Sequence, residues 1–250
     1  MKTDPGSPAP ARWPALSLFI AAASVSSLFL AWRLLASVDY LYPALYEPIG
    51  IGAHIDRFGP ENRYRAGFEQ TARPERQRLF AAIGRAIRDQ GRGLESLSYH
   101  DPAGKRLGSL LRPPEITHLR DVARLVGMLE KAGLAALVIL ILQIVVLDRR
   151  RRTLPKPGRM LLLTGAGFGV AVLAVIAIGP KAVFYAMHDW VFPAENQWFF
   201  FYQDSLMSTM MKAPDFFGYV AVAMTMMAVA LLWLILFAAS RLSHRRTQAR

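Results

Sequence analysis

The chain has 250 residues, of which 53% are hydrophobic and 19% are charged, and it contains no cysteine. The absence of cysteine excludes disulfides, thiolate metal sites and a thiol nucleophile. The net charge of +12 points toward nucleic acid, but most of it lies in three short segments beside apolar runs, at 1–12, 148–159 and 241–250. Lysine and arginine are placed in this way on the cytoplasmic flanks of membrane spans, and no nucleic-acid recognition motif accompanies them. The composition therefore predicts a membrane protein that does not bind nucleic acid.

Four apolar segments are long enough to cross a bilayer as helices, which requires about 20 residues. The basic flanks indicate which loops face the cytoplasm. The sequence therefore predicts an all-α membrane protein with four transmembrane helices, both termini in the cytoplasm, and an extracytoplasmic cap built mainly from the first outer segment. In chain order the parts are a cytoplasmic N-terminus (1–13), span 1 (14–38), the cap (39–121), span 2 (122–147), a basic cytoplasmic loop (148–159), span 3 (160–180), an aromatic-rich outer segment (181–217), span 4 (218–240) and a basic cytoplasmic tail (241–250).

The cap is too long to be a bare loop, so it should contain structure of its own. An amphipathic helix is predicted from Pro74, which suits a helix start, to about Gly91, which suits a stop. Two interpretations remain open: a helix packed on its neighbours in the cap, or a helix lying on anionic headgroups. The stretch ESLSYH is predicted as a short strand before the turn DPAG. The helix has an apolar stripe of Leu79, Phe80, Ile83, Ala86 and Ile87, and its remaining surface carries Arg76, Arg78, Arg85 and Arg88.

A histidine between two carboxylates lies just before span 2. Glu115, His118 and Asp121 recur every three residues, which places them side by side on a helix. Glu115 belongs in the first turn of that helix, where the helix dipole favours an acid. Two carboxylates beside one histidine can fix its tautomer and stabilise its cationic form. The competing interpretation is an exposed histidine in a salt-bridge ladder.

A second histidine, His188, follows span 3 at the same expected depth, the outer membrane interface. Residues 181–219 around it hold 12 of the 27 aromatic residues in the chain. Tryptophan and tyrosine gather at membrane interfaces in any case, so a belt would explain this density. Alternatively, the rings line a pocket for acyl chains and glycerol, with Phe184, Trp190 and Trp198 among its walls.

A metal site has weaker support in the sequence. The two histidines could hold zinc together with one of several acids, but no His-Glu-x-x-His helix motif is present. No phosphate-binding loop or glycine-rich fingerprint occurs either, and we predict no cofactor. The acids considered as zinc ligands are Glu115, Asp121, Asp189 and Asp204.

Serine chemistry is also weakly supported. Ser205 and Ser208 lie near His188 in the sequence, but the G-x-S-x-G elbow is absent. Asp204 is expected either to orient one of the histidines or to cap the short helix SLMSTMMK. Of the remaining histidines, we expect His54 in a glycine-bounded loop and His100 at a surface turn.

Two motifs together resemble a known family. The first is E-x-x-H-x-x-D-V at 115–122, and the second is H-x9-W followed by D-x-L and a P-x-F-F ending. In this order and at this membrane depth they resemble the bacterial integral membrane family of the lipoprotein intramolecular transacylase, Lit. The alternation of spans, outer segments and a basic inner loop fits the same family. The second motif comprises His188, Trp198, Asp204, Leu206, Pro214, Phe216 and Phe217.

The resemblance implies a multi-pass protein of the bacterial cytoplasmic (inner) membrane whose site faces the outer leaflet. Its partners would be membrane lipids and diacylglyceryl-modified lipoproteins. The acyl chain at the sn-2 position of the glyceryl group would move to the amine of the N-terminal cysteine and give the lyso-form. By motif position, the two catalytic histidines of the family correspond to His118 and His188. The alternatives from other classes are a non-catalytic accessory subunit that binds lipid or lipoprotein, and a metal-dependent membrane hydrolase.

Overall fold

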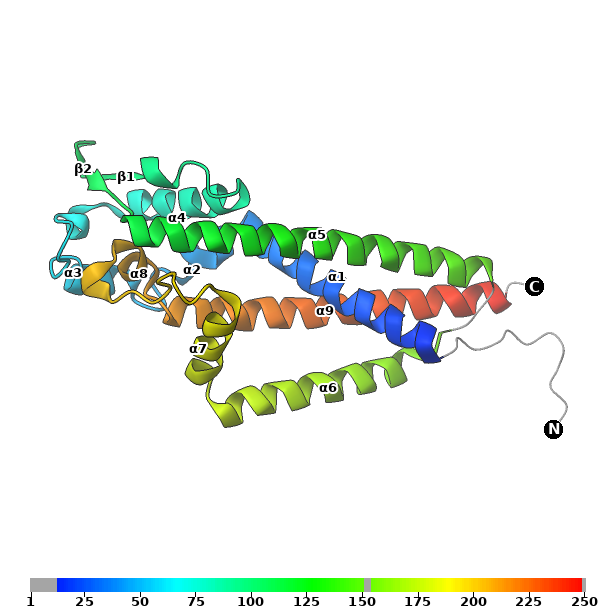
Figure 1. Ribbon diagram of the computed structural model, residues 1–250. Coiled ribbons are helices and arrows are strands. Elements are labelled where there is room, and N and C mark those ends of the chain that lie inside the picture. The colour runs from blue at the N-terminus through cyan, green and yellow to red at the C-terminus, as the bar shows by residue number, and fades with distance from the viewer. Residues whose placement is uncertain (1–12, 151–153, 249–250) are drawn as a thin grey trace, which may run out of the picture. The chain divides into compact units, whose positions relative to one another are not determined.

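The computed structural model describes residues 13–150 and 154–248, and these are mostly helical (Figure 1). They divide into two compact units, one comprising the described residues 13–32, 130–150, 154–184 and 224–248 (unit 1) and the other 33–129 and 185–223 (unit 2). The helices are α1 (Trp13–Ser37), α2 (Tyr42–Leu45), α3 (Ile51–Phe58), α4 (Arg73–Arg88), α5 (Pro113–Arg149), α6 (Pro157–Ile178), α7 (Pro180–Val191), α8 (Leu206–Met211) and α9 (Asp215–Gln248). Four short 3-10 helices cover Asp39–Leu41, Phe68–Gln70, Leu94–Ser96 and Tyr202–Asp204, and two strands are β1 (Ser98–His100) and β2 (Arg106–Ser109).

Four of these helices, α1, α5, α6 and α9, are long and apolar enough to cross a membrane. The predicted fold class, a helical membrane protein with four spans, is therefore confirmed. Helix α5 has 37 residues, a length of about 55 Å, which exceeds the ~30 Å of a hydrocarbon core. Its first turns, which precede the predicted span at 122–147, belong to unit 2.

Unit 1 is built from helices that meet through small residues. Its core contains Ala22, Ala23 and Ala239 beside larger apolar side chains. At Gly133 the ring of Phe29 comes so close that a Cβ atom would lie 2.4 Å from Cδ2 of that ring. Close approach at glycine and alanine is how helices pack where no hydrophobic effect drives them together.

Unit 2 has a core of large aromatic side chains. Tyr42 is fully buried and stacks on Phe80 with 4.2 Å between ring centroids, while Phe216 meets it edge-on at 5.5 Å. The Tyr42 hydroxyl donates a 2.9 Å hydrogen bond to the carbonyl of Met210 in α8, so the buried phenol is satisfied. This core joins residues of the first outer segment to residues of the second, which are distant in sequence.

Helix α4 occupies the place that its amphipathic pattern predicted. Leu79, Phe80, Ile83 and Ala86 are buried in the unit 2 core. The packed-helix interpretation is confirmed, and the headgroup-binding interpretation is wrong because the apolar stripe is covered by protein. The expectation that the arginines of this helix cover its outer surface is wrong for Arg76. Arg76 is buried and bonds to the Tyr46 hydroxyl (2.8 Å), the Thr71 hydroxyl (3.0 Å) and the Glu69 carbonyl (2.8 Å).

The predicted strand in ESLSYH is confirmed as β1, which pairs antiparallel with β2 in a two-stranded hairpin. His100 ends β1, and its Nδ1 lies 2.9 Å from Oε1 of Glu75 in α4. The glutamate also forms a bidentate pair with Arg78 at 2.6 and 2.7 Å. The hairpin is thereby tied to α4.

Two helices were not expected. His54 lies in α3 rather than in a loop, with its ring 4.7 Å from Phe58 and 4.4 Å from Tyr202. Helix α7 occupies the start of the aromatic segment, where no helix was predicted. The short helix predicted in SLMSTMMK is confirmed as α8, and its three methionines are buried.

Candidate active site

The candidate site lies in unit 2, and its first residues are at the N-terminal end of α5. Pro113 opens this helix, and its fixed φ and missing N–H suit a first helical position. Glu115 stands in the first turn as predicted, where the helix dipole favours an acid. His118 follows one turn later, before the predicted span. Glu115, His118 and Asp121 therefore lie on one continuous helix, α5.

The imidazole of His118 lies among aromatic rings of the second outer segment. Its centroid is 4.9 Å from that of Phe192, which it meets edge-on, and 6.1 Å from that of Phe200. The pKa of His118 is lowered from 6.5 to about 4, mainly by burial and in part by the positive charge of His188, while Asp121 acts in the opposite direction. The neutral imidazole is therefore the resting form above that pH.

His188 lies in the last turn of α7 and contacts the same phenylalanine. Its centroid is 5.3 Å from that of Phe192 and 4.8 Å from that of Trp198. The helix continues just far enough for the Phe192 amide to donate to the His188 carbonyl at 2.9 Å. Two histidines from separate helices thus contact one buried ring, and each is close enough to affect the charge of the other.

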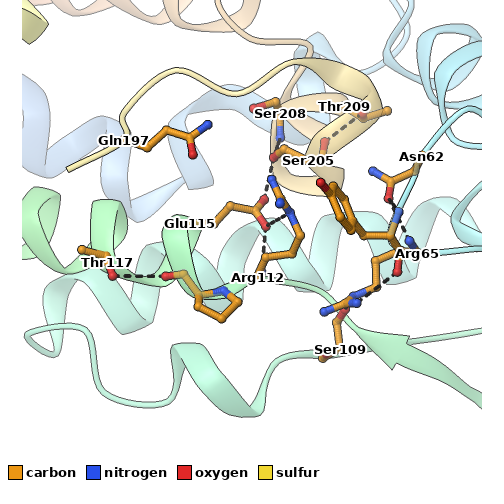
Figure 2. Close-up of polar contacts among 12 residues, drawn as sticks. Asn62, Arg65, Ser109, Arg112, Glu115, Thr117, Gln197, Ser205, Ser208 and Thr209 are labelled. Atoms are coloured by element: carbon orange, nitrogen blue, oxygen red, sulfur yellow. Dashed lines mark hydrogen bonds and ion pairs between the residues drawn. The ribbon is translucent and has the colours of Figure 1, made fainter. Parts of the chain in front are cut away.

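Glu115 is fully buried and has partners other than His118 (Figure 2). Its Oε1 accepts a 2.5 Å hydrogen bond from the Ser205 hydroxyl, and its Oε2 accepts from the Arg112 amide at 2.7 Å. The Arg112 Nε is 3.5 Å from Oε2. Burial raises the pKa of Glu115, while these bonds and the positive charge of Arg112 act in the opposite direction. A carboxylate without such partners would be costly to bury.

Asp121 is also buried and also reaches the second outer segment. Its Oδ2 accepts a 2.6 Å hydrogen bond from the side-chain amide of Asn196, and its Oδ1 pairs with Arg124 one turn along α5. The expectation that Glu115 and Asp121 hold the cation of His118 between them is therefore corrected. Both carboxylates are used in other contacts, and desolvation of the buried ring outweighs the attraction of Asp121.

The other expected site residues have separate places. The Trp198 indole donates to Oδ1 of Asp189 at 3.1 Å while its ring faces His188. Asp204 accepts a 3.2 Å bond from Arg63. The residue that caps α8 is Ser205, whose hydroxyl accepts from the Ser208 amide at 2.9 Å, so the prediction that Asp204 caps this helix is wrong.

Ser205 and Ser208 have structural positions. Ser205 is fully buried, with its hydroxyl engaged by Glu115 and the α8 backbone. Trp190 is 87% exposed and so does not wall an enclosed pocket in unit 2. Phe184 is half-buried and belongs to unit 1.

Sequence reasoning missed Phe192, Phe200 and Asn196. The two phenylalanines could not be distinguished from a membrane-interface belt, because only the fold shows that they face histidines rather than lipid. The sequence offered one indication of Asn196, which is a polar side chain in the turn PAEN. Its backbone N–H donates to the Pro193 carbonyl at 3.0 Å. Such turn residues are often structural, which hid its long-range bond.

Among the described residues, no group of three or more histidine, aspartate or glutamate side chains is arranged to hold a metal ion. The acids that the sequence offered as ligands are engaged as described above, with serine, asparagine, tryptophan and arginine partners. The donor set for zinc is thus not assembled around the two histidines in this part of the chain.

Residues 107–217, which contain both histidines and both buried carboxylates, match the family model of the lipoprotein intramolecular transacylase Lit. The resemblance predicted from the sequence is confirmed over these residues, which match the Lit family. The family is one of acyl-transfer enzymes, as its description states. No curated protein matches the chain in sequence.

Solved structures of the integral membrane lipoprotein intramolecular transacylase Lit from Bacillus cereus have the same fold. One superposes with a TM-score of 0.66 at 16% identity, covering 93% of this chain and 96% of that chain. A variant with a histidine-to-alanine substitution gives 0.66 at 15% identity, covering 93% and 94%. A histidine-to-arginine variant gives 0.62 at 16% identity, covering 94% of each chain. At this level of identity the likeness establishes the fold.

Proposed function

We propose that this chain is a membrane lipoprotein transacylase that moves an acyl chain from the sn-2 position of a diacylglyceryl group to the N-terminal cysteine amine of the same lipoprotein. The family match and the shared fold support lipoprotein transacylation in a membrane. The finer parts of the proposal are the sn-2 ester, the catalytic histidines and a site at the outer face of the bacterial cytoplasmic membrane. The resemblance to the family implies them, and the geometry around His118 and His188 is consistent with the histidine roles.

The observation that carries the proposal is the pair of imidazoles that both contact Phe192. A positive charge on His188 makes a charge on His118 more costly, so the pair favours one proton over two. One histidine that accepts a proton and one that donates it is the arrangement that acyl transfer to an amine requires.

The chemistry balances with these two groups alone. The neutral cysteine amine attacks the ester carbonyl carbon, a C–N bond forms, and His118 takes the proton that the nitrogen loses. The C–O bond to the glyceryl oxygen then breaks, and that oxygen takes a proton from His188. The products are an amide and a free sn-2 hydroxyl, and the proton on His118 returns to His188 to complete the cycle.

The low pKa of His118 applies to the site without substrate, and it should rise during the reaction. The oxyanion of the tetrahedral intermediate places a negative charge beside the ring, and a nearby opposite charge favours the imidazolium. The stabilisation therefore develops with the reaction rather than before it, as catalysis requires. Ester-to-amide transfer is downhill, so no nucleotide is needed. Holding both ends of one substrate molecule together contributes up to about 7–11 kcal/mol.

The test is mass spectrometry of the N-terminal peptide of a reporter lipoprotein, co-expressed with this protein in a host that lacks its own N-acyltransferase. We expect an N-acyl, S-monoacylglyceryl cysteine, and its loss with His118→Ala or His188→Ala. An unchanged diacylglyceryl cysteine, with the protein inserted in the membrane, would contradict the proposal. Full transfer by both alanine variants would refute the histidine roles while leaving transacylation standing.

A further inference from the structure

The two carboxylates that flank His118 in sequence fasten the same outer segment at two points. Three residues after His118, Asp121 Oδ2 accepts from Asn196 Nδ2 at 2.6 Å. Three residues before it, Glu115 Oε1 accepts from Ser205 Oγ at 2.5 Å (Figure 2). The E-x-x-H-x-x-D spacing thus brackets the histidine with two anchors. We call the chain between them, residues 196–205, the strap.

The strap carries ring contacts to both histidines. The Trp198 ring lies 4.8 Å from that of His188, and the Phe200 ring lies 6.1 Å from that of His118. Phe200 is buried, so its position depends on the backbone that bears it. Directly before the strap, the turn that holds Asn196 connects to Phe192 and α7. The orientation of one imidazole relative to the other therefore depends on where the strap begins.

The two anchors differ in surroundings. Glu115 and Ser205 are both fully buried, and the Ser205 hydroxyl also caps α8. Removing either would leave a buried polar group unpaired and would loosen α8, which is a stability effect. Asp121 is buried, but its second partner Arg124 has a side chain that is 73% exposed. The anchor at Asn196 thus lies at the edge of the unit, where a lost bond can be replaced by water.

We infer that Asp121 and Asn196 are positioning residues: their hydrogen bond holds the start of the strap, and with it Phe192 and Trp198, so that His118 and His188 face one substrate. This inference rests on the proposed function. Neither side chain needs to touch the substrate. A bound geometry that slips by about 1 Å costs roughly 10²-fold in rate, whereas binding of the acyl chains is unaffected by so small a shift. The role should therefore appear in kcat and not in KM.

The experiment measures kcat, KM and the midpoint of thermal unfolding for four variants in lipid bilayers with a diacylated lipopeptide. Asn196→Ala and Asn196→Asp each remove the donor to Asp121, and we expect kcat to fall by roughly 10²-fold with little change in KM. The swap Asp121→Asn with Asn196→Asp rebuilds an amide–carboxylate bond in the reverse direction and should recover most of the lost kcat. Glu195→Ala, at the exposed neighbouring residue, is the matched control and should behave as wild type.

Each contrary outcome has a distinct meaning. If Asn196→Ala keeps full kcat while His118→Ala loses it, the positioning role is refuted and the proposed function stands. If both keep full activity, the inference and the catalytic role of His118 fail together, while transacylation itself stands. A loss in Asn196→Ala that the swap does not recover refutes the hydrogen bond as the cause. A loss that tracks a lower unfolding midpoint in all of the variants assigns Asp121 to stability alone and equally overturns the inference.

Discussion

The two units bury apolar side chains by different rules. Unit 2 encloses large rings such as Tyr42, whose hydroxyl is bonded, as a protein does when water surrounds it. The helices of unit 1 pack through alanine and glycine, and leucines lie on the outside, such as Leu162 of α6, which is 71% exposed. Leucine facing hydrocarbon gains nothing by moving inward, so helix contacts there depend on close fit. The apolar residues are common to both units; the surrounding solvent decides what they do.

The polar groups show the same contrast. In unit 1, the Ser27 hydroxyl donates to the Ala23 carbonyl of its own helix at 2.7 Å. In unit 2, buried polar side chains join segments that are far apart in the chain, as Glu115 joins Ser205 across 90 positions. Bonds within a helix need no neighbour, whereas long-range bonds fix tertiary geometry. Unit 1 has long-range bonds as well, such as that from the Ser240 hydroxyl to the Pro155 carbonyl at 3.0 Å, but those of unit 2 involve the carboxylates that flank His118.

The largest expected effect concerns the two histidines of the site. His118→Gln and His188→Gln should each reduce transfer by ~10²-fold or more, because glutamine cannot exchange protons at the working pH. The matched control is His54→Gln, which changes a histidine in the same unit that lies away from the pair and should retain activity. Reporter mass spectrometry measures all three. A modest loss in the first two would favour the accessory-subunit alternative.

The next effect tests the aromatic core of unit 2. Tyr42→Ala should lower the free energy of unfolding by about 3–5 kcal/mol, since it empties a site between Phe80 and Phe216. Tyr42→Phe keeps the ring and should lose only about 1 kcal/mol with the bond to Met210. Denaturant unfolding followed by hydrogen exchange of α4 measures both. Equal losses for the two variants would contradict ring packing as the main term.

Acid should destabilise unit 2 through Glu75. Its bonds to Arg78, with a smaller contribution from His100, lower the pKa of this carboxyl from 4.5 to about 2. The stability that it contributes is present above pH 4.5 and is lost as the pH falls toward 2, and solvent screening of the exposed Arg78 keeps it small. Hydrogen exchange of the β1–β2 hairpin between pH 5 and about 2.5 measures the loss. Glu75→Gln should flatten this dependence, and an unchanged slope in that variant would assign it to other groups.

A further effect tests close fit in unit 1. Gly133→Ala should cost about 1–3 kcal/mol, because its Cβ would lie 2.4 Å from the Phe29 ring. Gly127→Ala in the same helix meets nothing within 4 Å and should be neutral or slightly stabilising. Thermal unfolding in bilayers compares them. Phe29→Ala should remove the cost of Gly133→Ala, and failure to do so would mean that the contact is not the cause.

The smallest effect concerns the lipid-facing surface. Leu162→Ala on α6 should change stability by no more than about 0.5 kcal/mol in a bilayer, since the side chain exchanges one hydrocarbon contact for another. Leu79→Ala in unit 2 removes a fully buried side chain and should cost about 2–5 kcal/mol. The same measurement serves both. Similar losses at the two leucines would erase the difference between the units.

The sequence predicted the helices that are long enough to show a periodic pattern of apolar residues. Four spans, α4 with its stripe from Leu79 to Ala86, and the start of α5 at Pro113 follow from 3.6-residue spacing and helix-start residues. Helices α3 and α7 were missed, because one is short and glycine-bounded and the other is crowded with aromatics that also suit an interface. Periodicity over so few residues does not separate a helix from a loop.

The site was predictable only in part. Spacing placed Glu115, His118 and Asp121 on one side of a helix, but spacing describes neighbours on that helix and not partners elsewhere. The partners Ser205 and Asn196 are 90 and 75 positions away, and the fold alone brings them in. The charge balance at His118 was expected to favour the cation for the same reason: burial by Phe192 and Phe200 could not be read from the local sequence.

The strap also limits how the length of this segment can vary. Its anchors on α5 are six residues apart, a rise of about 9 Å, whereas the strap between Asn196 and Ser205 could extend over roughly 30 Å. The chain therefore has about three times the length it needs, and part of the surplus is taken up by the 3-10 helix Tyr202–Asp204. Insertions or deletions of a residue can be absorbed in the middle of the strap without moving either anchor. Variation in length among related chains should gather there and avoid its ends.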